Sequence, residues 1–170
     1  IVKEGILLFD SGKVNFVETR VLTVSEERKK ANDYFDIWYP ESQGFLKVAT
    51  FCLSEGDLKI GAFNLHQAAE SLYYSLLLVF TGYKPKTHNL WKLRKKTKAY
   101  SDELFLVFKA ESDKQEEHLF DLLKRGYIEA RYKQKDYQIT RSELAELIER
   151  VKSMSRIVEG LCASKIESIR

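Results

Sequence analysis

The sequence contains few residues that interrupt helices or form disulfides, and no apolar segment long enough to span a membrane. Its 170 residues include two prolines, eight glycines and two cysteines, and no run of eighteen apolar residues. Scarce helix breakers and the lack of a long linker favour one compact helical bundle. Two distant cysteines and three scattered histidines give neither a disulfide framework nor zinc-ligand spacing, so we expect reduced thiols and no metal. With no apolar span and no signal peptide, we expect a cytoplasmic protein without a membrane partner.

Residues 58–81 show the clearest helical pattern. Their apolar side chains recur at steps of three and four, which places them on one stripe facing a core. Gln67, Glu70 and Tyr74 share a different face of the same helix. An uncompensated buried polar group costs roughly 1–3 kcal/mol, so these side chains are expected to have partners. The stripe consists of Leu58, Ala62, Leu65, Ala69, Leu72, Leu76 and Phe80.

Two further helices and a β-segment are expected before this helix. Ser25, followed by two glutamates, is the expected N-cap of the first helix. Pro40 lacks an amide hydrogen and is expected to end it, with a second helix over residues 41–54. Residues 1–22 contain two β-prone runs around an Asp-Ser-Gly turn, which is a hairpin signal. We therefore divide the chain into a β-segment, 1–22, and a helical domain, 23–170.

Capping residues mark the helices of the second half. Ser and Thr side chains accept hydrogen bonds from the first helical turn, and Glu or Gln three residues later completes a capping box. Residues 127–139, rich in tyrosine and lysine, are expected to connect the last two helices. The expected starts are Thr87 for a short helix to about Lys98, Ser101 for the next, Ser112 with Gln115 for a helix to about Gly126, and Thr140 with Glu143 for a long last helix.

The positive charge is concentrated in two stretches, although the net charge is only +3. Residues 84–98 contain seven Lys or Arg side chains and no acid, and residues 124–135 contain five with a single glutamate. Such clusters can attract phosphate groups. The alternative is that both stretches are solvated surfaces without a ligand.

Three sequence runs carry a resemblance to a known family. They are HQAAE at 66–70, GYKPKTHNL at 82–90 and KRGYIEARYKQKDYQIT at 124–140. With these motifs in this order, the chain resembles the HEPN domain family over about residues 44–161. The resemblance implies an all-α, antiparallel up-and-down helical bundle, and it implies a homodimer because HEPN domains commonly pair.

The resemblance also implies what precedes the bundle. In fused members of the family a nucleotidyltransferase domain comes first and ends on a strand much like KEGILLFD. Residues 1–22 would then be the tail of such a domain, in a longer bacterial or archaeal chain; an ordinary β-arm is the alternative. The glycine-serine turn and paired aspartates of a nucleotidyltransferase active site are absent from the sequence. This chain is therefore not expected to transfer nucleotides on its own.

Arg125, Tyr127, Arg131 and Tyr132 are the main candidates for nucleotide or phosphate binding. Arginine offers a planar fork for phosphate, and tyrosine can stack on a base or donate its hydroxyl. The four residues fall near a helix end and a loop, where binding residues concentrate, and where the ARY-type signature of the family lies. The alternative is structural: the tyrosines fix the loop to the bundle while the arginines pair with Glu70 or Glu129.

His66, Gln67 and Glu70 could complete the same cleft from the long helix. Glu70 would then hold an arginine in position. A lone histidine on a largely apolar helix is more often a hydrogen-bonded core residue, and His88, after the expected cap, is also more often structural. No cofactor is required, and a bound nucleotide is the expected ligand. The sequence contains no P-loop and no dinucleotide-binding glycine pattern.

The catalytic motif of HEPN ribonucleases is missing. Those enzymes carry an Arg followed by His after four to six residues, and no such pair occurs here. His118 and Arg125, seven residues apart on one expected helix, are the remaining catalytic candidates. The histidine could act as an acid or base near pH 7, and the arginine could stabilise phosphate charge. The alternative is an exposed histidine beside two glutamates.

Three functions therefore remain open. The first is a module that binds a nucleotide, phosphate or RNA and accompanies a nucleotidyltransferase domain. The second is a divergent ribonuclease toxin of a toxin–antitoxin pair. The third is an architectural bundle whose role is dimerisation.

Overall fold

The computed structural model describes residues 21–111, 113–132 and 135–170, apart from the side chains of residues 131 and 132. All regular structure in these ranges is helical, which confirms the all-α prediction. The expected β-segment lies outside the described residues except for Val21 and Leu22, which belong to no strand. The helices are α1 (Val24–Glu55), α2 (Leu58–Thr81), α3 (Leu90–Thr97), α4 (Asp102–Leu106), α5 (Lys114–Arg125), α6 (Glu129–Tyr132) and α7 (Arg141–Ser168).

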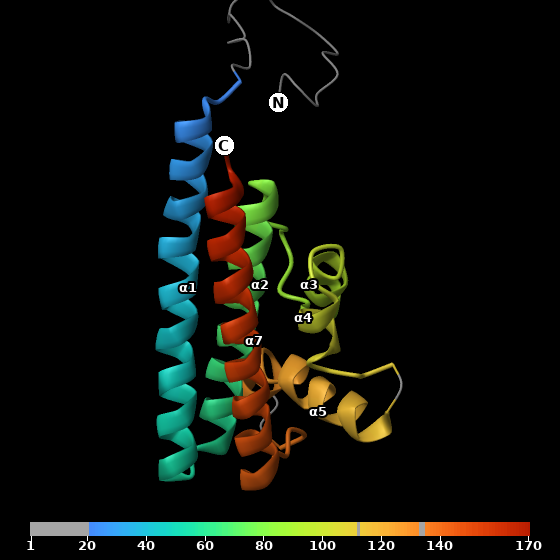
Figure 1. The fold of residues 1–170 in the computed structure, drawn as a ribbon. Helices are drawn as coiled ribbons and strands as arrows, with labels where there is room; N and C mark the ends of the chain where they lie inside the picture. The colour runs from blue at the N-terminus through green and yellow to red at the C-terminus, as the bar shows by residue number, and fades with distance from the viewer. Residues whose placement is uncertain (1–20, 112, 133–134) are drawn as a thin grey trace, which may run out of the picture.

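Three long helices form the body of the molecule (Figure 1). α1 and α2 are antiparallel and are joined at Gly56, which ends α1 with a φ of +87°. α7 packs against both and runs in the direction of α2, because α3 to α6 carry the chain back to the end at which α2 begins. These shorter helices lie on the side of α2 away from α1. The expected connection 127–139 contains the four-residue helix α6.

α1 is one continuous helix, so the prediction that Pro40 would divide it is wrong. The proline is exposed on the outer face of α1. The carbonyl of Asp36, which loses its amide partner there, is on that same open side and can bond water. Residues before and after the proline pack on the core, and this burial outweighs a local cost of about 3 kcal/mol.

The first helix starts at a capping box that differs from the predicted cap. Thr23, not Ser25, caps α1, and its side chain accepts a hydrogen bond from the backbone of Glu26. The Glu26 carboxylate in turn accepts from the Thr23 amide at 2.9 Å. A glutamate three residues after the cap makes this reciprocal pair, whereas Arg28 occupies the equivalent position after Ser25.

Two later caps are confirmed and two differ. Ser101 caps α4, and Thr140 caps α7 in the predicted capping box. α5 is capped by Asp113, while the predicted cap Ser112 lies outside the described residues. α3 is capped by Asn89 rather than Thr87, because the backbone of Thr87 is held against α2 instead.

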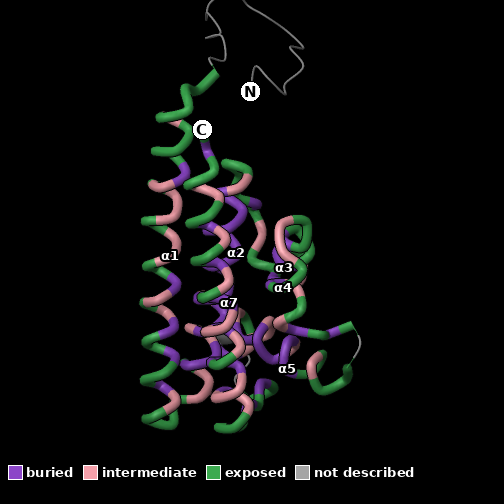
Figure 2. The backbone as a smooth tube through the Cα atoms, in the orientation of Figure 1, coloured by how far each residue is buried: buried purple, intermediate pink, exposed green. Residues whose placement is uncertain are grey.

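α2 is the central helix, and residues 68–79 are buried on every face (Figure 2). α1 and α7 cover one side of it, and α3, α5 and α6 cover the other. The predicted apolar stripe is therefore buried, but so are the polar residues Glu70 and Tyr74, which face the shorter helices. A helix buried all round gives its polar groups only protein partners, and those partners define the site below.

Gly126 allows the end of α5 to approach α2 closely. A Cβ at this position would lie 2.8 Å from the carbonyl oxygen of Ala62 and 3.2 Å from its carbonyl carbon. The φ of Gly126 is −52°, so close contact and not backbone conformation requires the glycine. Tyr127 follows directly and is placed against α2 by this approach.

Gly126→Ala is expected to lower the free energy of unfolding by about 1–3 kcal/mol, because the added methyl meets helix backbone that cannot yield. Gly160→Ala is the matched control, since it lies inside α7 with no atom within 4 Å of an added Cβ. It should raise stability by up to about 1 kcal/mol. Urea unfolding of both variants measures the difference, and equal effects would contradict this role for Gly126.

Candidate functional site

Residues from three parts of the chain line one pocket of about 500 Å³. The parts are the segment between α2 and α3, the second half of α5, and the residues leading into α6. Two of the sequence runs identified above, 82–90 and 124–140, thus meet in space; of the two basic stretches, only the second contributes basic residues to the lining, Lys124 and Arg125. We call this the Tyr127 pocket. It is lined by Thr87, His88, Asn89, Leu90, Asp121, Lys124, Arg125, Tyr127, Ile128 and Glu129.

The wall formed by residues 82–90 is fixed to α2. Gly82 ends α2 with a φ of +67°, a left-handed conformation that favours glycine. Five residues later, the hydroxyl of Tyr74 donates a hydrogen bond of 2.6 Å to the carbonyl of Thr87. This bond satisfies a phenol buried on α2 and turns His88 and Asn89 toward the end of α5.

Tyr127 contacts two imidazole rings. Its ring centroid lies 5.0 Å from that of His88, with the planes 16° apart, and 5.1 Å from that of His66, with the planes 24° apart. His66 is fully buried on α2, whereas the side chain of His88 is 59% exposed. Ring contacts of this kind contribute about 0.5–1.5 kcal/mol each beyond burial. Tyr127 is only half-buried and is one of the residues that line the pocket.

Glu70 holds His88 in position. The Nδ1 of His88 donates to Glu70 Oε1 at 2.9 Å, and the carboxylate is 6% exposed. The pKa of Glu70 is raised above its ordinary value, because the effect of burial exceeds the lowering by the His88 hydrogen bond and by the charge of Lys84. Glu70 was expected to hold an arginine; its partner is instead a histidine that the sequence analysis had treated as structural.

His66 is neutral and structural, as the sequence analysis expected of a lone histidine on this helix. Its Nδ1 donates to the carbonyl of Leu123 at 3.0 Å, which links α2 to α5. Burial lowers the pKa of His66 to about 4. At neutral pH the ring therefore acts as a fixed, uncharged support for Tyr127.

Arg125 lines the pocket but is already paired. Its Nε donates to Glu129 at 2.5 Å, an Nη lies 3.6 Å from Asp121, and another Nη donates to the carbonyl of Asp136 at 3.3 Å. Lys124 pairs with the same Asp121 at 3.0 Å. Two cations and two carboxylates therefore share this wall, and the pocket is close to charge-balanced instead of strongly positive.

The other predicted binding residues contribute less. Gln67 is absent from the lining of the Tyr127 pocket, and its Oε1 is buried without a hydrogen-bond partner in the described part of the chain. Arg131 and Tyr132 belong to α6, but their side chains lie outside the described residues. Of the seven predicted positions, Tyr127 and Arg125 line the pocket, and Glu70 and His66 support it from behind.

His118 and Arg125 are not brought together. Seven residues along a helix separate them by about 10 Å. His118 Nε2 pairs with Glu143 Oε1 at 2.8 Å and lines a neighbouring pocket of about 580 Å³ beside Trp91. Arg125 faces the Tyr127 pocket and its own carboxylates. The two side chains therefore line different pockets in this structure.

The sequence analysis did not select six polar residues of the pocket as binding residues: Thr87, His88, Asn89, Asp121, Lys124 and Glu129. Eighteen residues separate His88 from Glu70, so no local spacing reveals their pairing. The feature of the sequence that could have indicated these pocket residues was the polar run Thr-His-Asn directly before a helix. Such residues reach a pocket only when the loop that carries them is fixed, as it is here by Tyr74.

The pKa of His66 predicts a loss of stability in acid. Because the folded pKa of about 4 lies below the unfolded value of about 6.5, the unfolded chain takes up a proton first as the pH falls. Stability should therefore fall between about pH 6.5 and pH 4, by about 3 kcal/mol in total. In His66→Asn, whose amide can replace the Nδ1 donor, this contribution should vanish. Urea unfolding across this pH range gives the difference; parallel profiles for both proteins would contradict the assignment.

Comparison with known proteins identifies the family. The family model described as HEPN domain matches residues 35–161, which is about three quarters of the chain. No curated protein matches the chain. In the described part of the chain, no helix has the length and apolar character needed to cross a membrane. The same residues hold no cluster of three or more His, Cys, Asp or Glu side chains suited to a metal ion. The match includes all of α2, most of α1 and α7 and the Tyr127 pocket, and the chain belongs to the HEPN domain family.

Proposed function

We propose that this chain is a nucleotide-binding or RNA-binding module that holds a base in the Tyr127 pocket. One observation carries the proposal: Tyr127 is held by stacking contacts with His66 and His88, and it lines a pocket of about 500 Å³ together with the largely exposed ring of His88. Base stacking on an aromatic ring contributes about 1–3 kcal/mol and tolerates any base. Because His66 and His88 already orient the ring, a ligand would not have to order it.

The polar lining suits the edge of a base better than a bare phosphate. Asp121 and Glu129 supply carboxylate acceptors for amino groups. Asn89 uses its Oδ1 to cap α3, which leaves its amide Nδ2 as a donor. A naked anion would have to displace these carboxylates from Lys124 and Arg125. A charge-balanced, aromatic-walled pocket therefore favours a nucleobase.

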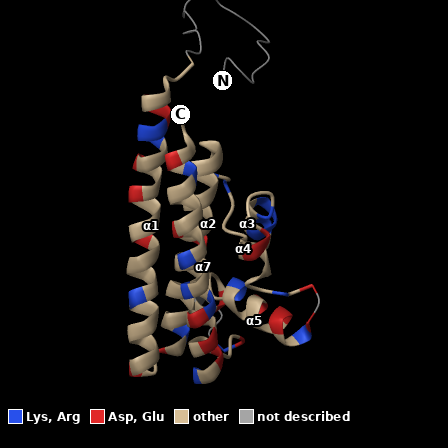
Figure 3. Cartoon of the chain, in the orientation of Figure 1, with Lys and Arg blue, Asp and Glu red and all other residues tan. Residues whose placement is uncertain are grey.

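The phosphate of the same ligand would meet cations that are still unpaired. Lys86 and Lys92 flank the pocket wall in sequence and are exposed, and neither forms an ion pair with any described residue. Figure 3 shows Lys and Arg residues gathered on α3 and on the segment before it. This arrangement shifts the expected phosphate role from Arg125 to the first basic stretch.

Tyr127→Leu tests the binding proposal, because it removes the aromatic face and keeps an apolar side chain. Calorimetric titration with ATP, GTP and a short oligoribonucleotide should give a Kd about tenfold or more higher than that of the wild type. Tyr83→Leu, at a tyrosine 60% exposed outside the pocket, should leave the Kd unchanged. Wild-type protein that binds none of these ligands, or a Tyr127→Leu variant that binds normally, would rule the proposal out.

RNA cleavage is a second candidate, favoured by the pairing of His88 with Glu70. A buried carboxylate that orients an exposed imidazole is the arrangement of a general acid–base catalyst, which typically contributes a factor of about 10² to 10⁴. Nε2 of His88 forms no hydrogen bond with any described residue. It is therefore the nitrogen that could exchange a proton with a ribose hydroxyl.

Purified protein should then cleave single-stranded RNA without added metal, and His88→Asn should remove at least about 99% of this activity. His118→Asn is the control, because His118 also pairs with a carboxylate, that of Glu143, but lines a different pocket. Fragments that persist in His88→Asn, or RNA that stays intact with the wild type, would leave the binding function alone.

The wider setting of this module is proposed from the family resemblance. We infer association with a nucleotidyltransferase domain, in the same or a neighbouring chain, and a cytoplasmic location. Both stay predictions. The Tyr127 pocket supports the first only in that a nucleotide bound there would be available to such a partner domain.

A further inference from the structure

Lys84 lies against the aromatic rings of two different helices. Its Nζ is 4.1 Å from the ring centre of Trp38 on α1 and 4.5 Å from that of Tyr74 on α2. The two rings meet edge to face, with their centroids 5.3 Å apart and their planes 72° apart. An ammonium group is attracted to the face of an aromatic ring, and here two rings act on the same cation. Lys84 therefore links the segment 82–90 to both α1 and α2.

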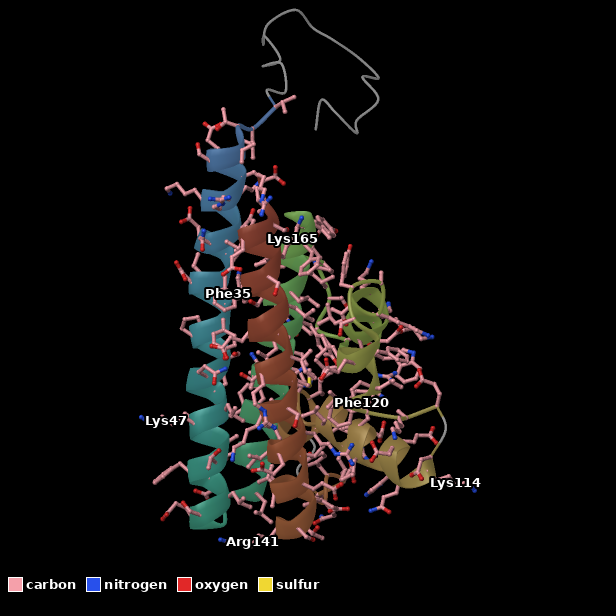
Figure 4. The ribbon with its side chains drawn as sticks, viewed as in Figure 1. Phe35, Lys47, Lys114, Phe120, Arg141 and Lys165 are labelled. Atoms are coloured by element: carbon pink, nitrogen blue, oxygen red, sulfur yellow. The ribbon has the colours of Figure 1, made fainter. Side chains whose placement is uncertain are left out.

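Tyr74 attaches the same segment a second time. Its ring contacts Lys84, and its hydroxyl donates to the carbonyl of Thr87 at 2.6 Å. Between these two attachment points Pro85 is buried and restricts the backbone, and the Thr87 amide donates to the Pro85 carbonyl at 3.0 Å. Side chains fill the space between α2 and the shorter helices that follow (Figure 4). The place of His88, the next residue, thus depends on how Lys84 and Thr87 are held.

Lys84 also acts on the carboxylate that holds His88. Burial raises the pKa of Glu70, and the hydrogen bond from His88 and the charge of Lys84 both oppose this rise. The ammonium thereby favours the ionised carboxylate, which is the stronger acceptor for the His88 Nδ1 at 2.9 Å. The position and the charge of Lys84 therefore support the same imidazole.

We propose that Lys84 is a positioning residue of the Tyr127 pocket: its ammonium, held by Trp38 and Tyr74, fixes the wall that carries His88 and so strengthens nucleotide binding. The effect on binding rests on the proposed function, whereas the effect on the wall does not. Lys84 is absent from the lining of the pocket, so it acts through the residues that it holds and not by touching the ligand.

This role makes α1 part of the support of the pocket. α1 lies on the side of α2 away from the shorter helices (Figure 1), and no residue of α1 lines the pocket. Trp38 nevertheless reaches the pocket wall through Lys84. A change at Trp38 should thus disturb His88 as a change at Lys84 does.

NMR of the ligand-free protein tests the positioning directly. In Lys84→Gln, which removes the charge, the ring signals of His88 and Tyr127 should move from their wild-type positions. In Lys84→Arg, whose guanidinium is also attracted to aromatic faces, they should stay close to them. Lys30→Gln is the matched control, because Lys30 is another exposed lysine over a ring of α1, 5.8 Å from the centre of Tyr34, and lines a different cavity. It should leave both signals unmoved.

Binding measurements separate positioning from direct contact with phosphate. If Lys84 positions the wall, Lys84→Gln should raise the Kd of adenosine and of ATP by the same factor, about three- to tenfold. A direct phosphate contact would weaken the binding of ATP alone and would overturn the proposal. In a Trp38→Leu background, Lys84→Gln should cost less affinity than it does in the wild type, because the cation has already lost one of its rings. Full additivity of the two changes would also contradict the proposal.

Ring signals that do not move in Lys84→Gln would overturn the proposal regardless of ligand binding. A wild-type chain that binds neither adenosine nor ATP would instead overturn the proposed function, while the ring signals would still decide whether Lys84 positions the wall.

Discussion

The end of α5 reaches α2 only because residue 126 is a glycine. With no Cβ there, the turn after α5 comes into contact with the carbonyl of Ala62, and Tyr127 is delivered to the buried ring of His66. His66 in turn ties the backbone of Leu123 to α2. One close approach thus fixes both a helix and the aromatic ring on which the candidate site depends. The same constraint explains why His66 is neutral, since the approach that creates the pocket also removes its imidazole from water.

Most charged groups near the pocket have structural partners, and this decides what the pocket can bind. Arg125 and Lys124 are matched by Asp121 and Glu129, so they hold the α5–α6 junction together and leave little net charge. Lys86 and Lys92, which form no ion pair with any described residue, are exposed and flank one wall of the pocket in sequence. An aromatic, charge-balanced interior with exposed lysines nearby in the sequence fits a nucleotide whose base enters first. It fits a free phosphate poorly.

Sequence patterns were sufficient where a local rule determines the structure. Helical periodicity and the caps at Ser101 and Thr140 depend on neighbours within one or two turns of helix. Pro40 failed as a helix breaker because packing of α1 on distant helices outweighs its local cost. The contacts of the candidate site were harder to predict from the sequence. The partners of Glu70 and Arg125 depend on how the loops pack against α2 and α5, and the positions of the carboxylates in the sequence do not show which basic side chain each one will contact. Tyr127 was found because it lies in a family signature, whereas His88 was found only through its contact with Glu70.

The central claim is that a nucleotide stacks in the Tyr127 pocket. NMR of the aromatic side chains during titration with a nucleotide tests it most directly, because the rings of Tyr127 and His88 would sense a stacked base through its ring current. The account predicts shifts of these two rings, with Tyr83 unaffected as an exposed ring outside the pocket. Saturable binding that leaves both rings unshifted would contradict it.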